Sequence, residues 1–125
     1  MLERHQNTLN YAKEHILKID NESKYGQIIQ SIWLFGSCAR KEEKYNSDID
    51  IIIIVNKIGD NERRLMRQMR SSATNIEDLN SPEIDVIFKY NNGDKNYIPW
   101  NDEKENNDTF SKQLRKDAIK IWERN

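Results

Sequence analysis

Two aspartates in front of an apolar run are the first candidates for chemistry in this chain. Asp48 and Asp50 directly precede the aliphatic residues 51–55, although aspartate is a poor strand former. Alternate residues of a strand face the same side, so we expect the two carboxylates to lie next to each other. Like charges repel at this distance unless a cation lies between them or one group takes a proton. Such oxygen ligands suit Mg²⁺, which also binds substrate phosphates.

A third aspartate occurs in a similar context. Asp85 lies inside the apolar segment 84–88, which predicts another strand. If this strand pairs beside the strand of Asp48 and Asp50, the three carboxylates could form one site. Two metal ions held there would stabilise the attacking and leaving oxygens of an in-line displacement. The alternative is a carboxylate that simply faces water at the edge of a sheet.

Gly36 and Ser37 come at the end of a predicted strand, where a short helix could begin. Glycine has no Cβ that would prevent close approach, and the start of a helix favours negative charge. The pair could therefore bind the phosphates of a nucleoside triphosphate. Arg40 could reach such a phosphate, or it could lie on the solvated side of the short helix.

Secondary-structure elements on both sides must position these residues. The spacing of apolar residues predicts an α/β (α+β) fold, with a small mixed sheet of three or more strands flanked by helices. We expect one domain over residues 1–125. Helices are predicted over residues 2–19, 38–44, 60–75 and 109–116, strands over 28–35, 48–56 and 83–90, a polar loop over 91–108, and a short apolar tail over 118–122.

Composition limits the possible partners and the compartment. Of the residues, 36% are hydrophobic and 33% are charged, so the core is thin and a partner protein or a second copy could cover part of the surface. The formal net charge of −1 argues against general nucleic-acid binding, which needs a basic surplus. We expect a cytoplasmic protein without a membrane segment, because the first residues do not resemble a signal peptide and residues 51–55 are too few to span a bilayer.

Several other residues have ordinary interpretations. Cys38, the single cysteine, is expected to pack as a small apolar side chain. His5 and His15 lack the spacing of zinc ligands and are expected at the surface. The sequence leaves open whether the arginines at 63, 67 and 70 form a solvated helix face or contact an acidic partner. It also leaves open whether the apolar residues of segment 97–100 pack on the core or face a partner.

The combined motif resembles that of the nucleotidyltransferase superfamily that includes DNA polymerase beta and the kanamycin nucleotidyltransferases. In that pattern a Gly-Ser pair is followed after about ten residues by Asp-x-Asp, and a third acid lies on a later strand. Here these are Gly36-Ser37, Asp48-x-Asp50 and Asp85. The segments 34–40 and 47–51 resemble the minimal nucleotidyltransferases, which are often encoded beside a helical partner of the HEPN type. Lys41 departs from the glycine that is common after Ala-Arg.

The resemblance implies a role for each motif residue within a nucleotidyltransferase fold. Gly36 and Ser37 would hold the β- and γ-phosphates of ATP. Asp48 and Asp50 would bind two Mg²⁺ ions, and Asp85 would ligate the catalytic metal and help to deprotonate the acceptor hydroxyl. The expected activity is transfer of a nucleoside monophosphate from its triphosphate to a hydroxyl group.

Three hypotheses differ in what receives the nucleotide. The first is an antitoxin that attaches AMP to a tyrosine of a HEPN-type toxin. The second is one subunit of an enzyme that modifies a small molecule such as an aminoglycoside. The third belongs to another class, a non-catalytic antitoxin that neutralises its partner by binding alone. Three acids together favour catalysis, and a domain of this size has little surface left to enclose an acceptor. A partner, or a homo-oligomer, would then complete the site.

Overall fold

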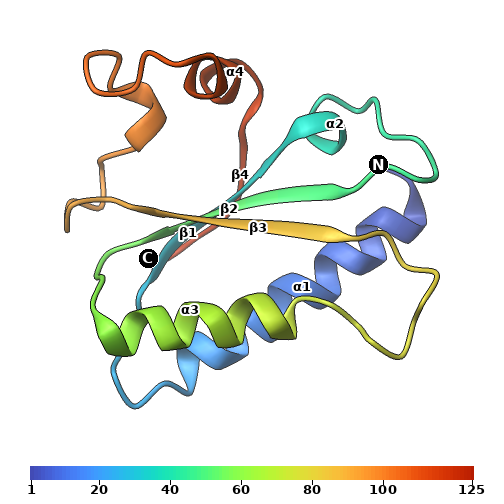
Figure 1. Ribbon diagram of the computed structural model, residues 1–125, viewed down its shortest axis with the longest axis horizontal. Helices are drawn as coiled ribbons and strands as arrows, with labels where there is room; N and C mark the ends of the chain where they lie inside the picture. The colour runs from blue at the N-terminus through green and yellow to red at the C-terminus, as the bar shows by residue number, and fades with distance from the viewer.

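The computed structural model describes residues 1–125 as a four-stranded sheet with helices on both faces (Figure 1). The predicted helices and strands at 2–19, 28–35, 48–56, 60–75, 83–90 and 109–116 are confirmed within a few residues at their ends. In chain order the elements are α1 (Glu3–Asn21), β1 (Ile29–Phe35), α2 (Gly36–Ala39), β2 (Ile49–Val55), α3 (Asp60–Ser72), β3 (Ile84–Tyr90), the 3₁₀ turn η1 (Pro99–Asn101), α4 (Thr109–Asp117) and β4 (Ile119–Glu123).

The sheet is mixed, as predicted, with the strand order β3-β2-β1-β4. Strand β1 pairs antiparallel with both β2 and β4, whereas β2 and β3 run parallel. A parallel pair needs a connection that crosses over the sheet, and α3 provides it. The central strand β2 has residues 51–55 buried, because helices or turns cover both of its faces.

The two faces of the sheet carry separate apolar clusters. Helices α1 and α3 lie together on one face (Figure 1), where they pack on the larger cluster around Ile16, Ile53 and Met69. The opposite face carries a smaller cluster around Ile52 and Trp100. The ring of Trp100 meets that of Trp33 edge-on, at 5.1 Å between centroids. The open question about segment 97–100 is thereby answered, because its tryptophan packs on the core.

One sequence prediction about the elements was wrong, and one segment without a predicted element proved to be a strand. The short helix is α2, which begins at Gly36 and ends at Ala39, whereas a helix was expected over 38–44. The apolar tail at 118–122 is the strand β4, which pairs with β1. It is short, and its residues are only half-buried or exposed. No helix is long and apolar enough to span a membrane.

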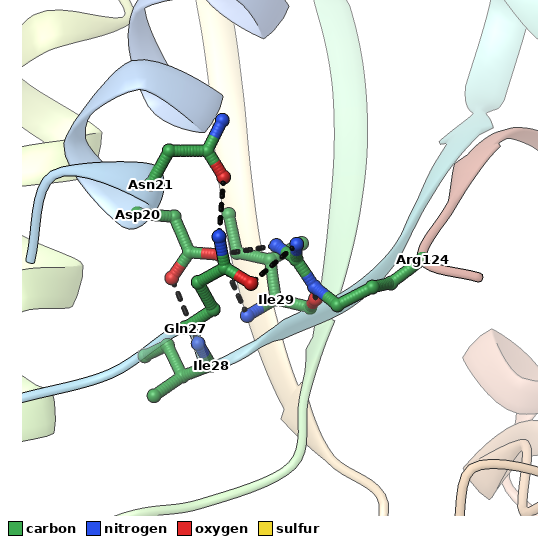
Figure 2. A network of polar contacts seen from close by, with 6 residues as sticks. All are labelled: Asp20, Asn21, Gln27, Ile28, Ile29 and Arg124. Carbon is green, nitrogen blue, oxygen red and sulfur yellow. Dashed lines mark hydrogen bonds and ion pairs between the residues drawn. The ribbon is translucent and has the colours of Figure 1, made fainter.

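An ion pair with a buried carboxylate connects the first helix to the residue that follows the last strand (Figure 2). The Asp20 side chain is fully buried and accepts hydrogen bonds from the backbone N–H groups of Ile28 and Ile29. Arg124 donates to Asp20 at 2.6 Å and to the carbonyl oxygen of Ile29 at 2.8 Å. Arg124 also donates to the side chain of Gln27. The contacts satisfy the carboxylate, which would otherwise be costly to bury.

Candidate active site

The parallel pairing of β2 and β3 brings two of the predicted acids together. Asp50 and Asp85 are Cα partners in register, so their side chains leave the sheet on the same face. This is the face of Ile52 and Ile87, which pack on the Trp100 cluster. Asp50 is half-buried and Asp85 is exposed. The two aspartates therefore lie at the margin of the apolar cluster that contains Trp100.

Gly36 lies against Asp50, and both its backbone conformation and this contact disfavour any residue with a side chain. It has a φ of +74°, which L-residues with a side chain rarely adopt. A Cβ atom at this position would overlap Oδ2 of Asp50 and lie 3.3 Å from its Cγ. The contact arises because Phe35, the residue before the glycine, is the Cα partner of Asp50 across β1 and β2. The predicted phosphate-binding turn and the predicted acids are thus adjacent.

The electrostatics of the acids show that they act on one another. The pKa of Asp50 is raised from 3.8 to about 6, first by burial and then by the negative charges of Asp85 and Asp48. A hydrogen bond between the carboxyl groups of Asp50 and Asp85, which needs a proton on one of them, raises the pKa further. Arg40 partly opposes the effect. The site therefore has an excess of negative charge.

Asp48 lies one residue before β2 and is exposed. As the side chains stand, no group of three acidic, histidine or cysteine side chains is placed to hold a single metal ion. The chemistry of the donors nevertheless fits Mg²⁺, because crowded carboxylate oxygens with a raised pKa are stabilised by a hard cation. The glycine turn lets the Asp50 carboxylate lie against the backbone of Gly36, a position that a side chain on residue 36 would obstruct.

The other two predicted nucleotide-binding residues lie at the same end of the sheet. Ser37 is half-buried in α2. Arg40 follows α2 and is paired with Glu42 at 3.1 Å and with Asp117 of α4 at 3.3 Å. The Arg40 side chain is partly exposed, and its pair with the exposed Glu42 is weak, so a phosphate could replace that partner. Arg40 also links α2 to α4, which covers this face.

His5 and Glu43 lie next to this site, and the sequence analysis did not single them out for it. The prediction that His5 is a surface residue was wrong, because its ring is fully buried and its Nε2 lies 2.8 Å from the carbonyl oxygen of Ser47. Its place on α1 could have been found, since His5, Leu9, Ala12 and Ile16 recur at helical spacing. Cys38 is buried as predicted, and burial is the main reason that its pKa is raised to about 11.

The arginines of α3 lie away from the acids. Arg70 donates to the carbonyl oxygen of Val86, with Nη2 at 3.2 Å, and its guanidinium lies over the ring of Phe88 at 5.1 Å. Val86 and Phe88 pack on the cluster beneath α1 and α3, which is the face opposite to Asp50 and Asp85. The stripe of arginines therefore does not contribute to the candidate site.

Comparison with known proteins identifies the family. A family model described as Polymerase beta, Nucleotidyltransferase matches residues 17–125, which is most of the chain. The chain belongs to the polymerase beta nucleotidyltransferase family. The resemblance noted in the motif is confirmed at the level of the family. A solved structure from Sulfolobus solfataricus, described as a "putative nucleotidyltransferase", has the same fold. Its TM-score is 0.53 with 21% identity, over 98% of this chain and 86% of that chain.

A curated relative of this chain comes from Methanocaldococcus jannaschii and is named "Putative protein adenylyltransferase MJ1215". The two are 46% identical over 46 residues, which is 37% of this chain. The match spans 54% of the relative, so it covers about half of that protein. A toxin–antitoxin structure solved with AMP-PNP aligns with a TM-score of only 0.46 and 18% identity, over 90% of this chain and 73% of that one.

Proposed function

We propose that this nucleotidyltransferase transfers AMP from ATP to a hydroxyl group of a partner protein, and that the acceptor is a tyrosine of a HEPN-type toxin. The observation that carries the proposal is the contact of Gly36 with Asp50, which stands in register with Asp85. A phosphate-binding turn and two interacting carboxylates at one point are what transfer of a nucleoside monophosphate requires. The name of the M. jannaschii relative supports a protein acceptor and an adenylyl donor.

In the proposed reaction the acceptor oxygen forms a bond to the α-phosphorus of ATP. The bond from this phosphorus to the bridging oxygen of the β-phosphate breaks, and pyrophosphate leaves. Asp85, which is exposed, would accept the proton of the acceptor hydroxyl. Gly36 and Ser37 would hold the β- and γ-phosphates, and Arg40 could exchange its exposed carboxylate partner for one of them.

Asp48, Asp50 and Asp85 would hold two Mg²⁺ ions. When bound, Mg²⁺ supplies positive charge to the triphosphate and to the developing charge of the reaction. The excess negative charge at Asp50, seen in its raised pKa, supports this part of the proposal. The half-buried position of Asp50 beside the apolar cluster also limits the access of water, which strengthens such electrostatic effects.

The test is a transfer assay with the protein encoded by the neighbouring gene. The purified pair is incubated with α-labelled ATP and Mg²⁺, and label on the partner is located by mass spectrometry. We expect a labelled tyrosine with the wild-type protein and none with Asp48→Asn/Asp50→Asn. A matched control is Asp94→Asn, which changes an aspartate in the loop after β3.

Other results would point to the alternative hypotheses. A stable complex that both versions form, without label on the partner, would contradict AMP transfer to protein and favour an antitoxin that acts by binding. Labelling of an added aminoglycoside, and not of the partner, would favour the two-subunit enzyme for small molecules. Exchange of ATP for GTP, CTP or UTP tests the assignment of the nucleotide.

A further inference from the structure

The segment between α2 and β2 carries one of the proposed metal ligands but little regular structure. Residues 40–48 lead from the Gly36-Ser37 turn to Asp48, and most of them are exposed. A ligand on such a segment must be held by contacts from outside, because a site that is loose by about an ångström loses much of its function. The contacts around Asp48 are therefore informative.

The backbone is fixed immediately before, at and after Asp48. The carbonyl oxygen of Ser47 lies 2.8 Å from Nε2 of His5. The carbonyl oxygen of Asp48 accepts from the thiol of Cys38 at 3.7 Å, and the N–H of Ile49 donates to the carbonyl oxygen of Glu83 at 2.8 Å. The Asp48 residue itself stays exposed. A backbone held at three successive residues presents this carboxylate in a limited set of orientations.

Among these three contacts, the His5 bond comes from the element most distant in the sequence, the first turn of α1. A carbonyl oxygen can only accept, so Nε2 of His5 must carry the hydrogen that it donates to Ser47. Nδ1 is buried without a hydrogen-bond partner. A buried nitrogen without a partner is unfavourable, and an apolar residue would fill this position on α1 without that cost. The donor therefore needs an explanation other than packing.

A second contact joins the same turn of α1 to the same segment. The N–H of Leu2, at the start of the helix, donates to Oε1 of Glu43 at 2.8 Å. The Glu43 side chain is only 5% exposed. A carboxylate at this end of a helix is favourable, because the free N–H groups there carry partial positive charge. The segment is thus attached to α1 at two points, one of which adjoins Asp48.

We propose that His5 is a positioning residue, which orients Asp48 through the carbonyl group of Ser47. The inference rests on the proposed function, in which Asp48 binds Mg²⁺. His5 does not touch the substrate or the metal. It fixes the direction in which the strand β2 begins, much as a group behind a metal ligand orients that ligand.

The test compares two amides of different length at position 5. The amide nitrogen of His5→Gln can reach the carbonyl of Ser47, whereas that of His5→Asn is one carbon shorter and falls out of reach. His15→Asn is the matched control, since His15 lies on the same helix and bonds only to the carbonyl of Tyr11, four residues before it. Folding of each variant is first checked by circular dichroism.

The main readout is binding of Mn²⁺ alone, followed by electron paramagnetic resonance at a temperature where all variants are folded. We expect His5→Asn to weaken binding by about tenfold, in the range seen for groups behind metal ligands. His5→Gln should stay within about threefold of the wild type, and His15→Asn should not differ from it. In the transfer assay, His5→Asn should need more Mg²⁺ for half-maximal rate while its kcat at saturating Mg²⁺ changes little.

Failure of this inference can be told apart from failure of the proposed function. If the wild type binds no Mn²⁺ and transfers no nucleotide, the proposed function is wrong, and the role of His5 falls with it. If the wild type binds and transfers, equal Mn²⁺ affinity in wild type and His5→Asn would overturn the inference alone. A lower melting temperature with unchanged Mn²⁺ affinity would do the same, because it shows a role in stability only. Weak binding by both amides would also overturn it.

Discussion

The negative charge of Asp50 should lower the stability of the metal-free protein, and replacing Asp50 by asparagine should therefore raise that stability. The pKa of Asp50 is about 6 in the folded protein, mainly because the group is partly buried and then because Asp85 and Asp48 are negative. A folded state with a raised carboxyl pKa loses stability as the pH rises from the unfolded value to the folded one. We therefore expect Asp50→Asn to be more stable than the wild type at pH 8 and equally stable near pH 4.

The size of the effect follows from the same values. The rise from 3.8 to about 6 corresponds to a ceiling of about 3 kcal/mol, because each pKa unit is worth about 1.4 kcal/mol. Asp50 is only half-buried, so water screens part of the repulsion, and we discount the figure to about 1 kcal/mol. For a domain of this size, that corresponds to roughly 4 °C in melting temperature.

The assay is thermal unfolding by circular dichroism, in EDTA, between pH 4 and pH 8. Glu77→Gln serves as the control, because it removes a negative charge from an exposed loop and Glu77 is not among the charges that shift the pKa of Asp50. The advantage of Asp50→Asn should develop between about pH 4 and pH 6 and then stay level. Added Mg²⁺ should stabilise the wild type more than the variant. A variant that is no more stable at pH 8, or whose advantage does not depend on pH, would refute the reasoning about repulsion at this site.

Three further predictions concern other features of the fold. Gly36→Ala should abolish transfer, and in a urea titration it should lower the free energy of unfolding by more than Gly93→Ala does. Both glycines have a positive φ, but only at Gly36 would a Cβ meet another side chain, so equal losses would contradict the reasoning. Arg124→Ala should lower the free energy of unfolding by about 3 kcal/mol in the same titration, because it leaves the buried carboxylate of Asp20 without its cation. A loss below about 0.5 kcal/mol would show that the fold does not need the ion pair. Cys38 should react with a thiol reagent such as dithionitrobenzoate at pH 8 only after urea unfolds the chain, because its thiol is buried and its pKa is raised to about 11. Fast labelling of the native protein would contradict this burial.

The sequence predicted those parts of the fold that depend on local patterns. The aliphatic run 51–55 indicated the strand β2, and aspartates in two apolar strand segments indicated that acids could form one site. The parallel register that sets Asp50 beside Asp85 could not be predicted, because the local sequence of neither strand determines which strand it pairs with. The proximity of Gly36 to these acids likewise depends on the pairing of β1 with β2.

The features that were missed depend on contacts between distant segments. Strand β4 has no fully buried residue. It forms because the edge of β1, about 90 residues earlier in the chain, is free to pair with it. The helix α2 starts at a glycine with positive φ, where propensity alone disfavours a helix. His5 was assigned to the surface because its spacing from His15 does not suit a zinc site, although its spacing from Leu9 placed it on the buried face of α1.

The ion pair of Asp20 and Arg124 has a consequence for synthesis on the ribosome. The two residues are 104 positions apart. At a translation rate of about 5–20 residues per second, Arg124 is therefore synthesised roughly 5–20 s after Asp20. During that interval the edge of β1 that later receives β4 is also unpaired, and such edges are prone to pair with other chains. The nascent protein would thus be most vulnerable to aggregation just before its last strand emerges, and slower translation of the final codons would prolong that state.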